Sequence, residues 1–106
     1  MKPSFDIDIV ERGDAVILIL DGEVDLATAS LLEEKLSVVE AQEATNVIVD
    51  LDRVSFMDST GLQVLIAHTL AKQNGSRVRL TKGSAQVQRL FEVSGLRDHL
   101  PFVTAN

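Results

Sequence analysis

The sequence contains no cysteine, which excludes disulfide bonds, thiolate catalysis and cysteine-based zinc sites. It also has no surplus of basic residues: 16 acidic residues stand against 10 basic ones, for a net charge of −6. An acidic chain repels phosphate backbones and anionic lipid surfaces. We therefore expect neither a nucleic-acid partner nor a membrane partner.

Long apolar runs are missing as well. The longest, Ala15 to Leu20, is far shorter than a membrane span. Acidic residues interrupt the N-terminus where a signal peptide needs an apolar segment, so we expect a cytoplasmic protein. A glycine-rich phosphate loop, a nucleophile elbow and a metalloprotease motif are also absent from the sequence. The sequence therefore predicts a protein that is not an enzyme, with no catalytic residues, cofactor or metal.

What remains is the composition of an ordinary globular protein. Of the 106 residues, 45% are hydrophobic and 25% are charged. This length suits one hydrophobic core and leaves little room for a second. We expect a single domain over residues 1–106.

The first third of the chain predicts a β-hairpin. Phe5, Ile7 and Ile9 alternate with other residues at the period of a half-buried strand. Residues 15–20 are apolar on both faces, which is typical of a central strand. A turn cluster with a glycine, residues 11–14, separates the two.

A crossover unit is predicted next. Asp25 is placed to cap a helix over about residues 26–42, and a buried strand follows at 47–51. The helix has apolar residues on one face: Ala29, Leu32, Leu36 and Val39. A strand, a helix and another strand favour parallel pairing of the two strands.

The rest of the chain continues the alternation of helices and strands. Residues 52–60 are predicted as a loop, 61–74 as a helix that stops at Asn74-Gly75, and 77–81 as a strand. Ser84 is placed to cap a short helix that Gly95 ends, and the tail from His99 forms at most a short edge strand. The expected fold is α/β, a mixed sheet of four to five strands in the order β-β-α-β-α-β-α with a weak final strand.

The most informative chemistry is Asp58-Ser59-Thr60-Gly61, which follows a buried strand and starts a helix. Ligand and modification sites gather at the carboxyl ends of such strands. The competing interpretation is that Asp58 or Ser59 is only an N-cap, a common feature that contributes about 1 kcal/mol. Spacing alone favours the cap.

Three segments in order carry a resemblance to a known family: residues 22–25 (GEVD), 54–62 (VSFMDSTGL) and 89–96 (RLFEVSGL). Together they resemble the STAS domain, from about Phe5 to Leu100. Within that family the chain looks most like a bacterial anti-sigma factor antagonist. Two departures stand out. Thr60 replaces the second serine of the motif, and the chain stops at Asn106, where family members usually continue into a C-terminal helix.

The resemblance implies a mechanism of partner switching. Such an antagonist binds an anti-sigma factor that is also a serine kinase, and this binding releases a sigma factor. The kinase, which itself binds the ATP, phosphorylates the antagonist and inactivates it, and a metal-dependent serine phosphatase reverses the step. The modified serine directly follows the aspartate of the motif, which here makes Ser59 the expected phosphoacceptor.

The resemblance also suggests residues that contact the partner. Asp25 is either such a contact or a helix cap, and both roles are compatible. Glu23 belongs to the same motif and is expected at the rim of the interface. Of two apolar candidates, Met57 is expected as an interface anchor and Phe56 as a core residue.

Three further residues are expected to shape the same site. Asp58 and Thr60 would form the loop and the helix start, with Thr60 also a possible second phosphoacceptor. Gly61 would let the backbone of a partner approach closely.

Several rival sites are disfavoured. A metal cluster of Asp50, Asp52 and Asp58 lacks further ligands at tight spacing. A phosphoaspartate receiver using Asp50 and Lys82 needs an acidic pair after a buried first strand, which is not there. A phosphocarrier needs a histidine at a helix start, whereas His68 lies within a predicted helix and is expected, like His99, at the surface.

One alternative stays open. Some STAS proteins are subunits of lipid-transport or signalling assemblies, or tails of anion transporters, and need no serine phosphorylation. The intact Asp58-Ser59-Thr60-Gly61 segment favours the regulatory role over this alternative.

Overall fold

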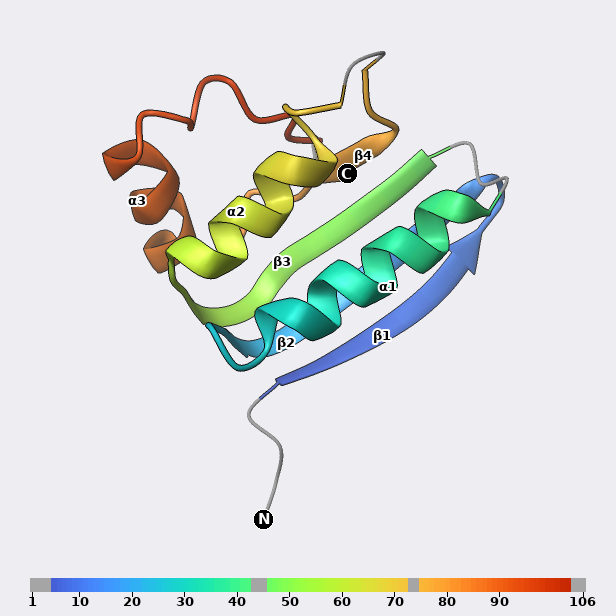
Figure 1. The fold of residues 1–106 in the computed structure, drawn as a ribbon, viewed down its shortest axis with the longest axis horizontal. Helices are drawn as coiled ribbons and strands as arrows, with labels where there is room; N and C mark the ends of the chain where they lie inside the picture. The colour runs from blue at the N-terminus through green and yellow to red at the C-terminus, as the bar shows by residue number, and fades with distance from the viewer. Residues whose placement is uncertain (1–4, 43–45, 73–74, 104–106) are drawn as a thin grey trace.

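The computed structural model describes residues 5–42, 46–72 and 75–103. A four-stranded sheet has its strands in the order β1-β2-β3-β4, with three helices packed against it (Figure 1). In chain order the elements are β1 (Phe5–Arg12), β2 (Ala15–Val24), α1 (Ala29–Ala41), β3 (Asn46–Met57), α2 (Ser59–His68), β4 (Val78–Leu80) and α3 (Ala85–Val93). The predicted α/β class and element order are confirmed. In place of a fifth strand, Phe102 forms a single bridge with Leu80.

The predicted hairpin is present. β1 and β2 pair antiparallel from Phe5 opposite Gly22 to Arg12 opposite Ala15. The two-residue loop between them starts with Gly13 at a φ of 60°, a conformation that type II′ hairpin turns require at this position. The parallel crossover is confirmed too, because β2 pairs parallel with β3 across α1.

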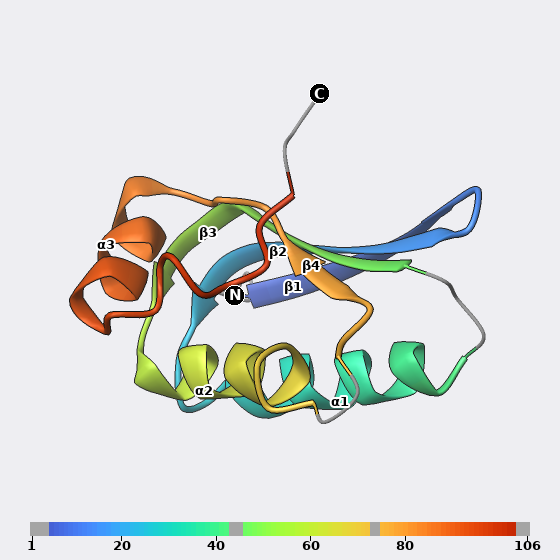
Figure 2. The same cartoon turned by 90° about the horizontal axis from the view of Figure 1, so that it is seen from above.

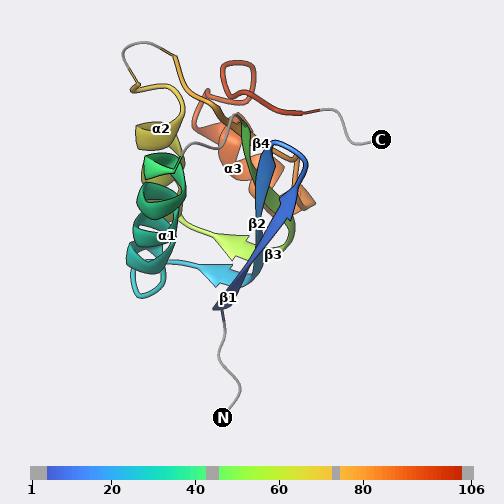
Figure 3. The same ribbon diagram turned by 90° about the vertical axis from the view of Figure 1, so that its right-hand side faces the viewer.

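The helices are arranged so that one layer covers the sheet. α1 and α2 lie side by side on one face, and α3 lies beside the end of β3 (Figures 2 and 3). The core between the layers contains fully buried side chains from both, among them Leu18, Leu36, Leu51, Leu65 and Phe91. Within the described ranges, no helix is long and apolar enough to cross a membrane.

The loop predicted over residues 52–60 is wrong, because β3 continues to Met57. The pairing of β3 with β2 shifts register twice, between Ile19 and Asp21 and between Gly22 and Glu23. Each shift inserts an extra residue into β3, so its buried residues fall every third position, at Leu51, Val54 and Met57. The two-residue alternation that marks a strand is therefore lost from the sequence.

Side chains form hydrogen bonds with backbone groups on the free edge of this extended strand. The amide of Leu51 donates to the Thr81 hydroxyl (2.8 Å). The Gln86 amide group on α3 pairs with both backbone groups of Met57, at 2.9 and 3.1 Å. Ser84 caps α3 as predicted, accepting from the amide of Val87 at 3.3 Å. α3 thus takes the place of a neighbouring strand beside the second half of β3.

The boundaries of α2 also differ from the prediction. The helix begins at Ser59 and ends at His68. The Thr69 hydroxyl donates to the carbonyl of Leu65 (2.7 Å), a local bond that competes with continuation of the helix. The predicted stop at Asn74 lies outside the described residues.

The prediction of a surface position for His68 is wrong. Its side chain is only 8% exposed and packs against α1, where Nε2 lies 2.7 Å from a Glu33 oxygen and Nδ1 contacts the Glu40 carboxylate. Ionised carboxylates only accept hydrogen bonds, so these two contacts form ion pairs in the form of His68 in which both ring nitrogens donate. His99 is exposed, as predicted.

Candidate functional site

Asp58 organises the junction between β3 and α2. Its amide donates to the carbonyl of Val24 in β2 (3.0 Å). Its carboxylate accepts from the amides of Thr60 (2.9 Å) and Gly61 (3.3 Å) and from the Thr60 hydroxyl. The amide of Leu26 also hydrogen-bonds this carboxylate. Asp58 is therefore the N-cap of α2 and a link to the segment before α1.

These hydrogen bonds set the charge state of Asp58. The Thr60 hydroxyl, and then the amides of Gly61, Thr60 and Leu26, lower the pKa of the Asp58 carboxyl below its usual 3.8, against an opposing effect of burial. A carboxyl whose pKa is lowered by folding stabilises the protein above its unfolded pKa. That stabilisation is lost as the pH falls through the folded pKa.

We expect Asp58→Asn to make the free energy of unfolding depend less on pH in the acid range. Asparagine still caps the helix but has no titrating carboxyl, so the variant should lose less stability than the wild type between about pH 5 and about pH 2. Asp58→Ala should cost about 1 kcal/mol at about pH 7. Urea unfolding followed by circular dichroism measures both. Equal acid limbs for wild type and Asp58→Asn would contradict the assigned hydrogen bonds.

Ser59 is the first residue of α2 and is exposed. Among the described residues its hydroxyl has no hydrogen-bond partner. A hydroxyl at this place is accessible to another protein. The amides of Thr60 and Gly61 beside it are already occupied by Asp58, so an added phosphate would face solvent and not replace the cap.

The expected roles of Phe56 and Met57 are exchanged in the structure. Met57 is 1% exposed and belongs to the core, whereas Phe56 is 41% exposed. The register shifts of β3 turn Met57 inward opposite Val24 and leave Phe56 outside, opposite Glu23. The predictions of Met57 as a surface anchor and of Phe56 as core are both corrected by this arrangement.

Gly61 is buried in a close contact within the domain. A Cβ there would lie 2.7 Å from Val24 Cγ1 and 2.9 Å from Met57 Cγ. The missing side chain therefore lets α2 approach its own sheet. The prediction that Gly61 makes room for the backbone of a partner is corrected accordingly.

Asp25 caps a turn at residues 25–28 and not α1 itself, which begins three residues later than predicted with Thr28 at its N-cap position. Its carboxylate accepts from the amides of Ala27 (3.0 Å) and Thr28 (3.2 Å), and its own amide donates to the Thr28 hydroxyl (2.9 Å). The turn formed in this way delays the start of α1 to Ala29. Asp25 stays partly exposed, which leaves a contact with a partner open.

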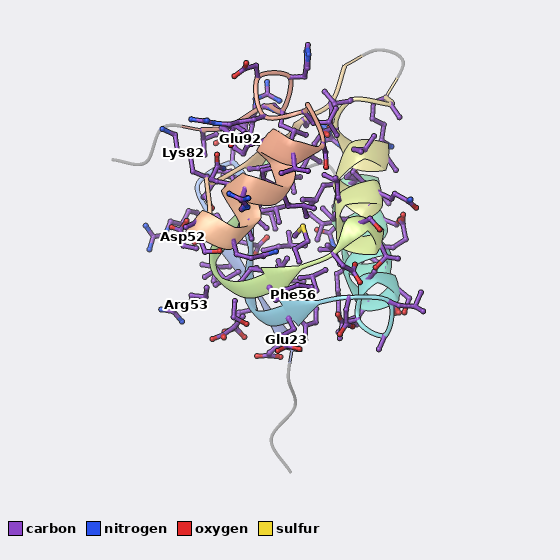
Figure 4. The ribbon with its side chains drawn as sticks, turned by 90° about the vertical axis from the view of Figure 1, so that its left-hand side faces the viewer. Glu23, Asp52, Arg53, Phe56, Lys82 and Glu92 are labelled. Atoms are coloured by element: carbon purple, nitrogen blue, oxygen red, sulfur yellow. The ribbon has the colours of Figure 1, made fainter. Side chains whose placement is uncertain are left out.

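One large apolar residue at this end of the sheet was not singled out from the sequence. Leu26 is 79% exposed, in the segment tied to Asp58. Glu23 and Phe56 face outward together on neighbouring strands (Figure 4). We call this surface the Ser59 face and define it by Glu23, Asp25, Leu26, Phe56 and Ser59. It combines exposed apolar groups with acidic ones. No local sequence pattern indicated that Leu26 would be exposed.

The other candidate clusters do not form sites. Asp50 accepts from the amide of Asp52 (2.9 Å), within its own strand. Across the part of the chain that the structure describes, no group of three or more histidine or acidic side chains is arranged to hold a metal ion.

The model of the STAS domain family matches residues 6–105. The chain belongs to the STAS domain family. The anti-sigma-B factor antagonist of Listeria monocytogenes is 38% identical over 97 residues, which cover 90% of this chain and 85% of that protein. The antagonist of Bacillus subtilis is 32% identical over 96 residues, covering 90% and 87%.

Solved structures agree with the fold. The anti-sigma factor antagonist SpoIIAA in its unphosphorylated form gives a TM-score of 0.70 at 29% identity, covering 94% of this chain and 88% of that chain. The phosphorylated form of SpoIIAA from Bacillus gives 0.62 at 29% identity, covering 94% and 91%. An antagonist from Mycobacterium paratuberculosis gives 0.84 at 22% identity, covering 96% and 87%, a likeness of fold.

Proposed function

We propose that this protein is an anti-sigma factor antagonist that binds an anti-sigma serine kinase through the Ser59 face and is inactivated by phosphorylation of Ser59. The observation that carries the proposal is the exposed Ser59 hydroxyl at the start of α2, next to the Asp58 cap. The nucleotide is bound by the kinase. A serine phosphatase would restore the binding form.

The surroundings of Ser59 support a protein partner. Leu26 and Phe56 expose apolar area, and burial of such groups is the main contribution to specific interfaces. Glu23 and Asp25 are acidic and lie at the rim. A kinase surface with an apolar recess for Leu26 and Phe56, and with basic residues only at the rim opposite Glu23 and Asp25, would complement this face.

Rigidity of the loop supports the switch as well. The Asp58 carboxylate joins the start of α2 to the segment before α1. Ser59 and Leu26 are therefore presented on one fixed surface. A preorganised surface loses less conformational entropy on binding than a mobile one.

The test is to incubate the protein with candidate anti-sigma serine kinases and ATP, and to measure intact mass. We expect one added phosphate on the wild type and none on Ser59→Ala. Thr60→Val is the matched variant, because its hydroxyl bonds Asp58 and is not free to react. It should still be phosphorylated. A phosphate added to the Ser59→Ala variant would show that another residue is phosphorylated.

Binding is measured on the same proteins without ATP by titration calorimetry. We expect Phe56→Ser to weaken binding, while His99→Ser, at an exposed position after α3, should leave it unchanged. If no kinase binds and co-purification instead recovers membrane transport subunits, the proposal fails. The chain would then act as a subunit of a transport assembly.

A further inference from the structure

β1 is an edge strand with one side open. It pairs only with β2, at one end of the order β1-β2-β3-β4 (Figure 3). An open edge presents unpaired backbone groups to another strand. The eight residues of β1 make this the longest open edge in the described part of the sheet, apart from the stretch of β3 that α3 covers.

Along each strand, successive residues direct their backbone N–H and C=O groups to opposite sides. This alternation shows which backbone groups of β1 lie on its open side. The amide of Val47 donates to the carbonyl of Arg77, just before β4, and that of Asn46 donates to the carbonyl of Asp14, just before β2. When this alternation is carried across the register of the sheet, the peptide groups of Ile7, Ile9 and Glu11 lie on the open side of β1. These three alternate residues can form backbone hydrogen bonds with a second strand, which is enough to define the register of that pairing.

Exposed apolar side chains accompany this edge. Ile9 is 45% exposed although it lies on the helix-covered face, opposite the fully buried Leu18. On α1, Leu31 and Val38 are 37% and 53% exposed and stand two turns apart. Each precedes by two residues a glutamate that contacts His68 of α2. They therefore lie on the side of α1 that faces away from α2 and toward β1 (Figure 1).

The charges of β1 select one way of pairing with itself. Asp6, Asp8 and Arg12 point to the uncovered face and have no hydrogen-bond or ion-pair partner among the described residues. In an antiparallel pair of β1 strands centred on Ile9, Asp6 of each copy lies opposite Arg12 of the other. Registers shifted toward the N-terminus bring aspartates opposite aspartates. Opposite charges across strands stabilise a pair and like charges destabilise it.

A shift the other way also matches charges but shortens the pairing. Centring on Val10 puts Asp8 opposite Arg12, and only residues 8–12 of the two strands then overlap. Centring on Ile9 pairs residues 6–12 with their symmetry mates and places the exposed Ile9 side chains against each other. This register makes more hydrogen bonds than the Val10-centred one and joins the apolar groups of the two copies.

We propose that the β1 edge is a homodimer interface, in which two copies pair antiparallel about Ile9 and join their sheets into one. The Asp6–Arg12 pairs set the register, and Ile9, Leu31 and Val38 form its apolar side. Charged side chains on an edge strand usually prevent it from pairing with other strands. On β1 the same charges are complementary to those of a second copy of β1, so they allow pairing with that partner. Ser59 follows β3, two strands away from this edge, and Glu23 lies on β2 beyond the Phe5–Gly22 end of its pairing with β1. An interface centred on Ile9 is therefore separate from the Ser59 face.

The test is a charge-reversal cycle measured by sedimentation equilibrium from about 10 μM to about 1 mM, where weak protein contacts become half-saturated. The wild type should approach twice the monomer mass. Asp6→Arg and Arg12→Asp each place like charges opposite one another at two symmetric positions. Each should weaken the dimer by about 10-fold.

The double variant carrying Asp6→Arg and Arg12→Asp restores opposite charges and should dimerise within about threefold of the wild type. Asp98→Arg makes the same change of charge as Asp6→Arg at an exposed turn away from β1, and should have no effect. Thermal melts confirm that each variant is folded. A wild type that is monomeric throughout, or a double variant that stays monomeric, overturns the proposal.

Discussion

Phosphorylation of Ser59 should weaken binding to the anti-sigma serine kinase by at least about 30-fold, with a range up to several thousand-fold. A phosphoserine carries about −1.5 to −2 charges. Burial of that dianion in an interface without a matched cation costs roughly 2–5 kcal/mol. Asp58, Asp25 and Glu23 are acidic and supply no cation to match the phosphate.

The fold itself should tolerate the modification. Ser59 is exposed in the first turn of α2, where the positive end of the helix dipole favours an anion. Asp58 already occupies the amides of Thr60 and Gly61, so the phosphate does not need to displace them. We expect a change in free energy of unfolding within about 1 kcal/mol.

Calorimetric titration of the kinase with unmodified and phosphorylated protein measures the loss of affinity. Ser59→Glu, with a single charge, should give a smaller loss in the same direction. Ser94→Glu adds the same charge at the exposed end of α3 and serves as the control, with binding expected to stay within about twofold. Equal affinity of the two phosphorylation states would remove the switch from the proposed function.

Replacement of His68 by leucine should lower the free energy of unfolding by about 3 kcal/mol. The imidazole of His68 lies between the carboxylates of Glu33 and Glu40, and the Glu40 side chain is only 13% exposed. Removal of one partner of a buried ion pair leaves the other charge without compensation, which costs about 3–5 kcal/mol. Lys72, with its Nζ 3.6 Å from Glu40, offsets part of this cost.

The origin of the loss is tested by a second substitution. Glu40→Gln in the His68→Leu background removes the stranded charge and should recover more than half of the lost stability. His99→Leu is the matched control at an exposed histidine and should stay within about 0.5 kcal/mol of the wild type. Urea unfolding followed by circular dichroism gives all four values. A loss below about 1 kcal/mol for His68→Leu would show that the carboxylates of Glu33 and Glu40 do not depend on His68 for compensation of their charge.

The elements with regular periodicity were predictable. The β1–β2 hairpin, the crossover through α1 and the cap of α3 by Ser84 follow from local patterns and agree with the structure. The second half of β3 was not predictable, because its residues satisfy two register shifts set by β2. A strand whose buried positions repeat every third residue has no local signal that distinguishes it from a loop.

Some features of the candidate site could likewise be predicted from the sequence, and others could not. The Asp58-Ser59-Thr60-Gly61 segment could be located from its residues, since an acidic cap and a hydroxyl at a helix start are local features. Which apolar neighbour is exposed could not, because a one-residue slip of pairing exchanges the faces of Phe56 and Met57. Leu26 was missed for a related reason, since its exposure depends on the turn that Asp25 makes before α1.

The sequence by itself determined the class of fold, the hairpin, the crossover and the place of Ser59, because these depend on periodicity, turn residues and caps within a few positions. Only the tertiary structure decided the ion pairs of His68, the inward position of Gly61 and the exposure of Phe56. Each of these depends on a residue about 30 positions away or on a neighbouring strand. The free energies that select them come from burial and pairing across elements, which no local pattern contains.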